Sequence, residues 1–196
     1  MHIDWQKKEV IFKIVYFGPG LGGKTTNLEY IHRTLNPELR GKLISFKTKE
    51  ERTLYFDYLP LSVGRINGKR PRFHLYTVPG QVHYGYGRKI ITSGADSIVF
   101  VADSQRPRMQ ENIASLKDLQ YKLAIQDKDL ASFPWVMQYN KRDLPNIDSV
   151  HALESKLNQF GVPHFTASAL YGQGVMQTLK RAIKMAVSYA SQPEMS

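Results

Sequence analysis

Short apolar stretches alternate with amphipathic ones along this chain. The stretches "VIFKIVYF" (10–17), "SIVFVADS" (97–104) and "PWVMQYN" (134–140) are almost continuously apolar, which is typical of strands covered on both faces. Between them, apolar residues recur at helical spacing, as in "RMQENIASLKDLQYKLAIQ" (108–126). The same spacing predicts helices over 24–35, 150–161 and 174–187, and "PHFTASAL" (163–170) is expected to form the last strand.

This order predicts an α/β protein. The stretches "YFDYLPLSVGRI" (55–66) and "PRFHLYTV" (71–78) flank Asn67-Gly68, which indicates a hairpin. The remaining strands alternate with helices, including a helix expected after the second hairpin strand, so we expect a mostly parallel six-stranded sheet with one antiparallel edge strand. Helices on both of its faces make three layers, and residues 1–196 are expected to form one domain. Ligands of such sheets bind at the carboxyl ends of the strands.

The first of these strand ends carries a phosphate-binding pattern. "GPGLGGKT" (18–25) reads G-x-x-x-x-G-K-T and lies between a predicted strand and a predicted helix. The glycines allow backbone N–H groups to face an anion at the positive end of the helix dipole. Lys24 can reach the β- and γ-phosphates, and the Thr25 hydroxyl can bind Mg²⁺. The alternative, a glycine-rich turn with a surface lysine, does not account for the flanking strand and helix. The residues expected to bind the nucleotide here are Gly18, Pro19, Gly20, Leu21, Gly22, Gly23, Lys24, Thr25 and Thr26.

A second strand end carries a pattern for the base. In "YNKRDL" (139–144), Asn140, Lys141 and Asp143 form N-K-x-D. A carboxylate at Asp143 can accept hydrogen bonds from N1–H and the 2-amino group of guanine, and adenine offers neither donor. Such a site discriminates by factors on the order of 10⁴ or more. Taken alone, Asp143 could equally be a helix cap or a turn residue.

The end of the last strand adds a third loop to this expected site. Its Ser168-Ala169 pair is expected to bring a backbone N–H near the base, followed by Leu170. The three loops together favour a guanine nucleotide, GTP or GDP, with Mg²⁺. A metabolic P-loop kinase or ATPase is disfavoured by this guanine pattern and by the lack of a lid insertion.

The composition of the chain bears on its cellular location and on whether it binds membranes or nucleic acids. The chain has no cysteine, and His2 stands at the position where a myristoylation signal requires glycine, so it lacks disulfides, thiolate metal sites and the common lipidation signals. With no apolar signal region and no apolar run long enough to cross a bilayer, we expect a cytoplasmic protein without integral or lipid-anchored membrane association. The net charge is +10, with basic residues concentrated between Arg65 and Lys89. Nucleic-acid binding is one interpretation; a solvated face beside a phosphate site is favoured, because no nucleic-acid-binding motif accompanies it.

With these motifs in place, the sequence resembles the small Ras-like GTPases, and more closely the bacterial MglA family of motility and cell-polarity GTPases. The stretches that carry the resemblance are "KIVYFGPGLGGKTTNL", "ERTLYFDYLPL", "RFHLYTVPGQV", "VFVADS" and "YNKRDLP", from about Lys13 to Pro145. Thr77 stands where most Ras-like proteins carry Asp, and the MglA-like group carries Thr.

The resemblance implies roles for four further residues. Thr53 is similar to the first-switch threonine that senses Mg²⁺ and the γ-phosphate, and Gly80 to the glycine whose N–H touches that phosphate. Gln81 resembles the glutamine that orients the attacking water, and Arg52 a built-in arginine finger. Each has a simpler alternative: Thr53 could begin a strand, Gln81 could cap a helix, and Arg52 could be a surface residue. The expected catalytic residues are therefore Lys24, Arg52 and Gln81, and the expected metal ligands are Thr25 and Thr53.

The resemblance also implies a slow switch that depends on partners. A hydroxyl at Thr77 would hold Mg²⁺ more weakly than a carboxylate, and Leu170 replaces a lysine that often covers the base. Asp103, at a strand end, is interpreted as structural. We expect unaided GTP hydrolysis at about 10⁻⁴–10⁻² per second. The expected partners are an MglB-like homodimeric activating protein of the roadblock fold and motility or polarity effectors, with recruitment to a cell pole. A scaffold that holds GTP without hydrolysing it is the alternative.

Overall fold

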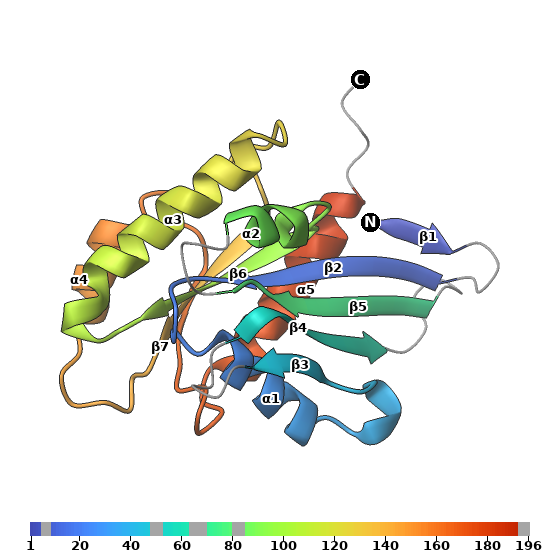
Figure 1. The fold of residues 1–196 in the computed structure, drawn as a ribbon, viewed down its shortest axis with the longest axis horizontal. Coiled ribbons are helices and arrows are strands. Elements are labelled where there is room, and N and C mark those ends of the chain that lie inside the picture. Colours follow the sequence, from blue (N-terminus) through green and yellow to red (C-terminus); the bar gives the residue numbers. More distant parts are fainter. Residues whose placement is uncertain (5–8, 48–52, 63–69, 80–84, 192–196) are drawn as a thin grey trace.

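A computed structural model describes residues 1–4, 9–47, 53–62, 70–79 and 85–191, which build one sheet with helices on both faces (Figure 1). Its parallel part consists of β5 (Arg70–Thr77), β2 (Glu9–Phe17), β6 (Ser97–Asp103), β7 (Trp135–Asn140) and β8 (His164–Thr166), hydrogen-bonded in that order. Antiparallel pairing adds β4 (Thr53–Ser62) beside β5, β3 (Ile44–Lys47) beside β4, and β1 (His2–Asp4) beside β2. The predicted α/β class with a mostly parallel sheet is confirmed.

Two groups of helices form the outer layers. One face of the sheet packs against α1 (Lys24–Thr34) and α5 (Val175–Ala190), and the other against α2 (Gly85–Thr92), α3 (Met109–Ala124) and α4 (Val150–Leu157). Two short 3₁₀ helices, η1 (Pro37–Leu39) and η3 (Arg106–Arg108), precede β3 and α3. The expected three layers are therefore present. None of the helices that the structure describes is both long enough and apolar enough to cross a bilayer.

The alternation of side chains along the central strands creates two separate cores. In β2, Ile14 and Tyr16 contact the layer of α1 and α5, whereas Val15 and Phe17 contact the opposite layer. All four side chains are fully buried, as is every residue of β6. Because both faces are covered there, residues 14–17 of β2 and 98–102 of β6 carry apolar or aromatic side chains without interruption, which explains the continuous apolar runs.

The sheet is wider than the six strands expected from the sequence. In the described residues it has eight, because β1 and β3 add to it. The strand β4 was expected at the edge of the sheet, but β3 pairs with it and takes the edge position. Both added strands have only three or four residues, too few for an alternating pattern to stand out. The predicted hairpin pairing between β4 and β5 is present, in the register Tyr58↔Tyr76 to Ser62↔Arg72, while its turn at Asn67-Gly68 lies outside the described residues.

Two predicted boundaries also differ. The helix expected to end at Gly161 ends at Leu157, and the Asn158 side chain fixes the turn that follows by accepting from Val162 N (2.9 Å) and donating to Val162 O (2.8 Å). The last strand was expected over 163–170 but pairs only over His164–Thr166. Ser168 instead forms an isolated antiparallel bridge with Gln173. Ala167 still bonds the end of β7 through its backbone, and residues 168–170 then leave the sheet and form a loop.

Candidate functional site

The loop between β2 and α1 has a backbone that requires glycine at two positions. Gly18 and Gly23 have φ values of 144° and 96°, in the region that side chains disfavour. A Cβ atom at Gly18 would lie 2.3 Å from the Val101 carbonyl oxygen, and one at Gly23 would lie 2.1 Å from Asn140 Nδ2. Leu21 also has a positive φ of 58°, and its side chain is exposed. The predicted phosphate loop thus packs tightly against β6 and β7.

Lys24 begins α1, and its side chain is folded onto this loop. The residue is 5% exposed, and its Nζ donates to the Pro19 carbonyl (2.6 Å) and the Gly18 carbonyl (3.1 Å). Backbone carbonyls are weaker partners for an ammonium group than an anion is. The lysine is therefore buried beside the loop in a position where an anionic ligand would improve its interactions.

The electrostatic surroundings of Lys24 support this view. Burial, aided by the positive charges of Arg88 and Arg108, lowers the pKa of its ammonium group to about 7, and Asp57 opposes the shift. A phosphate brought beside Lys24 would favour the charged form. The site is thus arranged to gain electrostatic stabilisation when a negative ligand arrives.

A buried carboxylate next to the loop was missed in the sequence. Asp57, in β4, is fully buried and accepts hydrogen bonds from Thr25 Oγ1 (2.5 Å) and Thr77 Oγ1 (2.7 Å) at the same oxygen. Its other oxygen accepts from Ser45 Oγ, and its backbone N–H donates to Thr77 Oγ1 (2.8 Å). The presence of Thr77 suggested a site without a carboxylate, but Asp57 supplies one. The signal was the single charged residue inside the apolar strand "YFDYLPL", since charged side chains are rarely buried without a partner.

Asn140 connects the three loops expected to contact the nucleotide. It ends β7 and is 2% exposed. Its Nδ2 donates to the Gly22 carbonyl (2.9 Å) in the phosphate loop, and its Oδ1 accepts from the Ala169 N–H (2.8 Å) in the loop after β8. The predicted base-binding residues Ser168 and Ala169 are buried there, while Leu170 is 61% exposed. One carboxamide thus holds residues distant in sequence at one edge of the sheet.

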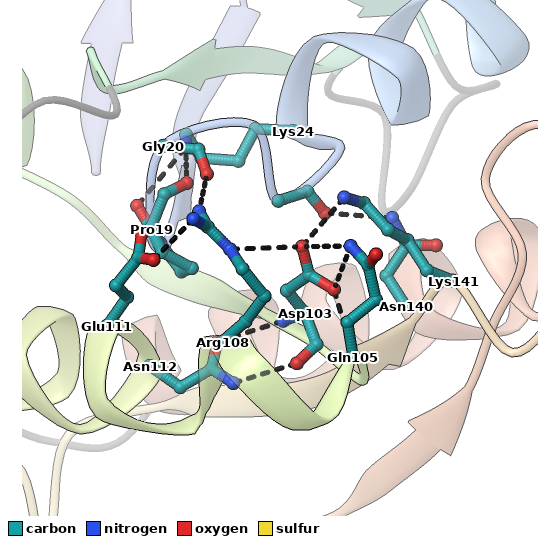
Figure 2. Close-up of polar contacts among 12 residues, drawn as sticks. Pro19, Gly20, Lys24, Asp103, Gln105, Arg108, Glu111, Asn112, Asn140 and Lys141 are labelled. Atoms are coloured by element: carbon teal, nitrogen blue, oxygen red, sulfur yellow. Dashed lines mark hydrogen bonds and ion pairs between the residues drawn. The ribbon is translucent and has the colours of Figure 1, made fainter. Parts of the chain in front are cut away.

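The other two residues of the base pattern lie beside Asn140. Lys141 adopts a left-handed backbone with φ 66°, and its Nζ lies 2.7 Å from a carboxylate oxygen of the fully buried Asp103. Figure 2 shows Asp103 between Lys141 and Arg108, with Arg108 reaching the phosphate loop. Asp143 is exposed at the same strand end, where a base could meet it.

The described residues cover only part of the expected catalytic set. Arg52, Gly80 and Gln81 lie outside them, so their roles stay predictions. Thr53 begins β4 and pairs with Lys47 through the backbone, which places it at a strand start.

Within the described part of the basic stretch between residues 65 and 89, Arg88 is buried rather than on a solvated face. Arg88, in α2, is 1% exposed; its Nε donates to the Pro79 carbonyl (2.8 Å), and its Nη1 pairs with Asp118 Oδ2 (2.8 Å). Its guanidinium also lies over the Phe17 ring, 5.0 Å from the centroid. Arg88 therefore holds the chain in place just before Gly80 rather than presenting its charge to solvent.

Comparison with known proteins agrees with this architecture. A scan of protein-family models finds none that matches the chain. A curated relative, the "Mutual gliding-motility protein MglA" of Myxococcus xanthus (strain DK1622), is 52% identical over 186 residues, which cover 95% of each chain. Identity at this level over nearly the whole length establishes common ancestry and fold. The chain therefore belongs to the MglA family, as its motifs indicated.

Proposed function

We propose that this protein is a guanine-nucleotide switch that hydrolyses GTP to GDP and phosphate. The observation that carries the proposal is the position of Asn140, whose carboxamide joins the phosphate loop at Gly22 to the loop after β8 at Ala169. This arrangement brings a predicted phosphate site, with Lys24 at its centre, next to a predicted guanine site at Asp143. We propose that one nucleotide spans these two sites. Lys141, Ser168, Ala169 and Leu170 would complete the surroundings of the base.

The oxygen atoms around Thr25 fit Mg²⁺. Hydroxyl and carboxylate oxygens are the ligands that this cation prefers, and the Thr25 hydroxyl lies 2.5 Å from the fully buried Asp57 carboxylate, with the Thr77 hydroxyl on the same oxygen. We propose that Thr25 and Thr53 hold Mg²⁺, as the sequence suggests, and that Asp57 supplies the negative charge that Thr77 cannot. When bound, the ion would neutralise charge on the β- and γ-phosphates.

The remaining catalytic roles are proposed for Arg52, Gly80 and Gln81, which lie close in sequence to Asp57 and Thr77. Gln81 would orient the attacking water, Arg52 would stabilise charge on the transferred phosphoryl group, and the Gly80 N–H would contact the γ-phosphate. Lys24 would bind the phosphates throughout. Arg88 supports this proposal because it fixes Pro79, the residue directly before Gly80.

The relative's name refers to gliding motility, and we propose that this chain likewise serves surface motility or cell polarity. In the GTP state it would recruit effectors of that system. A homodimeric roadblock-fold protein of the MglB type would accelerate hydrolysis by positioning Arg52 and Gln81. The protein would act in the cytoplasm, with recruitment to a cell pole, and without binding nucleic acid.

Single-turnover hydrolysis of bound GTP tests the catalytic roles. With the activating partner present, we expect Arg52→Ala to slow phosphate release by roughly 10³-fold or more, since a charge-stabilising arginine contributes about 10³–10⁵ in related reactions. Gln81→Leu is expected to slow it as well, because leucine cannot orient water. Both variants should still bind GTP.

Two matched variants control this experiment. Arg106→Ala and Gln110→Leu change exposed residues of the same types on η3 and α3 and should hydrolyse GTP at the wild-type rate. Wild-type rates in Arg52→Ala and Gln81→Leu would refute the two roles. No phosphate release from wild-type protein with its partner would instead support a GTP-holding scaffold.

A further inference from the structure

An arginine outside the sequence motifs contacts the phosphate loop directly. Arg108 ends η3, and its Nη2 donates to the Gly20 carbonyl at 2.6 Å. The same guanidinium lies 3.6 Å from Asp103 through Nε and contacts Glu111 through Nη1. Figure 2 shows the side chain extending from the start of α3 up to the loop, with its planar end between Gly20 and Asp103. Arg108 is thus shared between the phosphate loop and a buried carboxylate.

Asp103 is held firmly enough to position this arginine. Its side chain is fully buried, and its backbone N–H and C=O both bond the Asn112 carboxamide, at 2.9 and 2.8 Å. The carboxylate also accepts from the backbone and side chain of Gln105 (3.1 Å each) and pairs with Lys141 (2.7 Å). A buried carboxylate with this many partners is held in one place, because moving it would break several of these contacts at once. Asp103 therefore ties Arg108, at the phosphate loop, to Lys141, in the base pattern.

The contact with Gly20 determines the direction of a neighbouring amide. The peptide between Gly20 and Leu21 is trans, so its C=O and its N–H point in opposite directions. Since the Gly20 C=O points at Arg108, the Leu21 N–H points away from it. Leu21 has a positive φ of 58°, a backbone conformation that costs free energy for a leucine unless surrounding contacts hold it. Anion-binding loops hold phosphate through successive N–H groups aimed in this way.

We propose that Arg108 is a positioning residue of the phosphate loop, whose guanidinium, fixed by Asp103, turns the Leu21 N–H toward the β-phosphate of a bound guanine nucleotide. Asp103 also pairs with Lys141, so the same carboxylate holds one residue at the phosphate loop and one in the base-binding loop. This inference rests on the proposed function. It adds Arg108, which directly precedes α3 and belongs to neither the phosphate pattern nor the base pattern. It also assigns Asp103 a role at the site.

The test compares the affinities of GDP, GMP and IDP in wild-type, Arg108→Ala and Arg108→Lys protein, measured by calorimetry. GMP lacks the β-phosphate, and IDP lacks the 2-amino group of guanine, so the GDP:GMP ratio reports the phosphate loop and the GDP:IDP ratio reports the base site. Arg108→Ala is expected to lower the GDP:GMP ratio about tenfold, the effect of losing one charge-assisted hydrogen bond. Its GDP:IDP ratio should stay unchanged. Arg108→Lys keeps the charge but cannot contact Gly20 and Asp103 together. Its GDP:GMP ratio should therefore lie between those of the wild type and Arg108→Ala.

A variant of the shared carboxylate and a matched control complete the design. Asp103→Asn should lower both ratios, because it releases Arg108 and Lys141 together. Arg106→Ala removes an equal charge from the same short helix, where the guanidinium contacts Ile147 rather than the loop, and should change neither ratio. Thermal unfolding of each ligand-free variant checks that it is folded.

Several outcomes would overturn the proposal. An unchanged GDP:GMP ratio in Arg108→Ala, or an equal loss for GDP and GMP together with a lower melting temperature, would reduce Arg108 to a structural residue. An equal effect of Arg106→Ala would mean that only overall charge matters. Failure of wild-type protein to bind any guanine nucleotide would refute the proposed function itself, and it would be seen before any variant is made.

Discussion

Replacing Lys24 with alanine is expected to abolish most of the affinity for GTP and GDP. The ammonium group is buried on the carbonyls of Gly18 and Pro19, and in the proposed site it is the cation that binds the phosphates. Removing one partner of a buried charge pair costs about 2–5 kcal/mol. At 1.4 kcal/mol per tenfold change, affinity should fall roughly 30- to 4,000-fold. Fluorescence titration with a labelled guanine nucleotide measures this loss.

The folded state should survive the Lys24 substitution. Burial already lowers the pKa of this ammonium group, so the ligand-free protein gains little stability from its charge. We therefore expect a melting temperature close to wild type in ligand-free Lys24→Ala. Lys180→Ala, on the exposed face of α5, is the matched control and should bind nucleotide normally. Undiminished GDP binding by Lys24→Ala would contradict the assignment of the phosphate site.

The second large effect is expected at Asp57, where Asp57→Ala should weaken both the fold and the response to Mg²⁺. The substitution leaves the hydroxyl groups of Ser45, Thr25 and Thr77 without the carboxylate that they share. Unsatisfied buried polar groups cost about 1–3 kcal/mol each, and we expect the free energy of unfolding to fall by about 2–5 kcal/mol in total. If Asp57 also serves Mg²⁺, the Mg²⁺ concentration that half-maximally slows GDP release should rise about tenfold or more, since the site loses its negative charge.

Asp57→Asn separates the two effects. An asparagine keeps the size of the side chain and one acceptor oxygen, so it should retain more stability than alanine while still losing the charge. Glu38→Ala removes an exposed carboxylate from η1 and should alter neither property. A wild-type Mg²⁺ response in folded Asp57→Asn would exclude Asp57 from the metal site and leave it a purely structural role.

The tight loop between β2 and α1, the candidate phosphate loop, could be predicted from the sequence because its determinants are local. Gly18, Gly23 and Lys24 lie within seven consecutive residues, and each has a physical reason to be there: two backbones that a side chain would obstruct, and one cation at a helix start. The order of strands and helices was predictable for a similar reason. Strands such as β6, buried over their whole length, leave continuous apolar runs that cannot be confused with an exposed segment.

The parts that could not be predicted depend on contacts between distant segments. Asp57 approaches Thr25 from a different strand, and Arg108 reaches Gly20 across 88 positions of sequence. Asp103 appeared structural because its partner Lys141 belongs to another strand end. Such pairs have no fixed spacing in the sequence that could be recognised, and only the fold brings the two residues together.

The most direct test of the central claim is a competition between nucleotides for the wild-type protein. A fluorescent GDP analogue is bound in the presence of Mg²⁺ and then displaced by increasing GDP or ADP. A pocket that joins the loop at Lys24 to a guanine-specific carboxylate at Asp143 predicts displacement by GDP at a concentration about 10⁴-fold or more below that of ADP. Equal displacement by the two nucleotides, or no binding of the analogue at all, would contradict it.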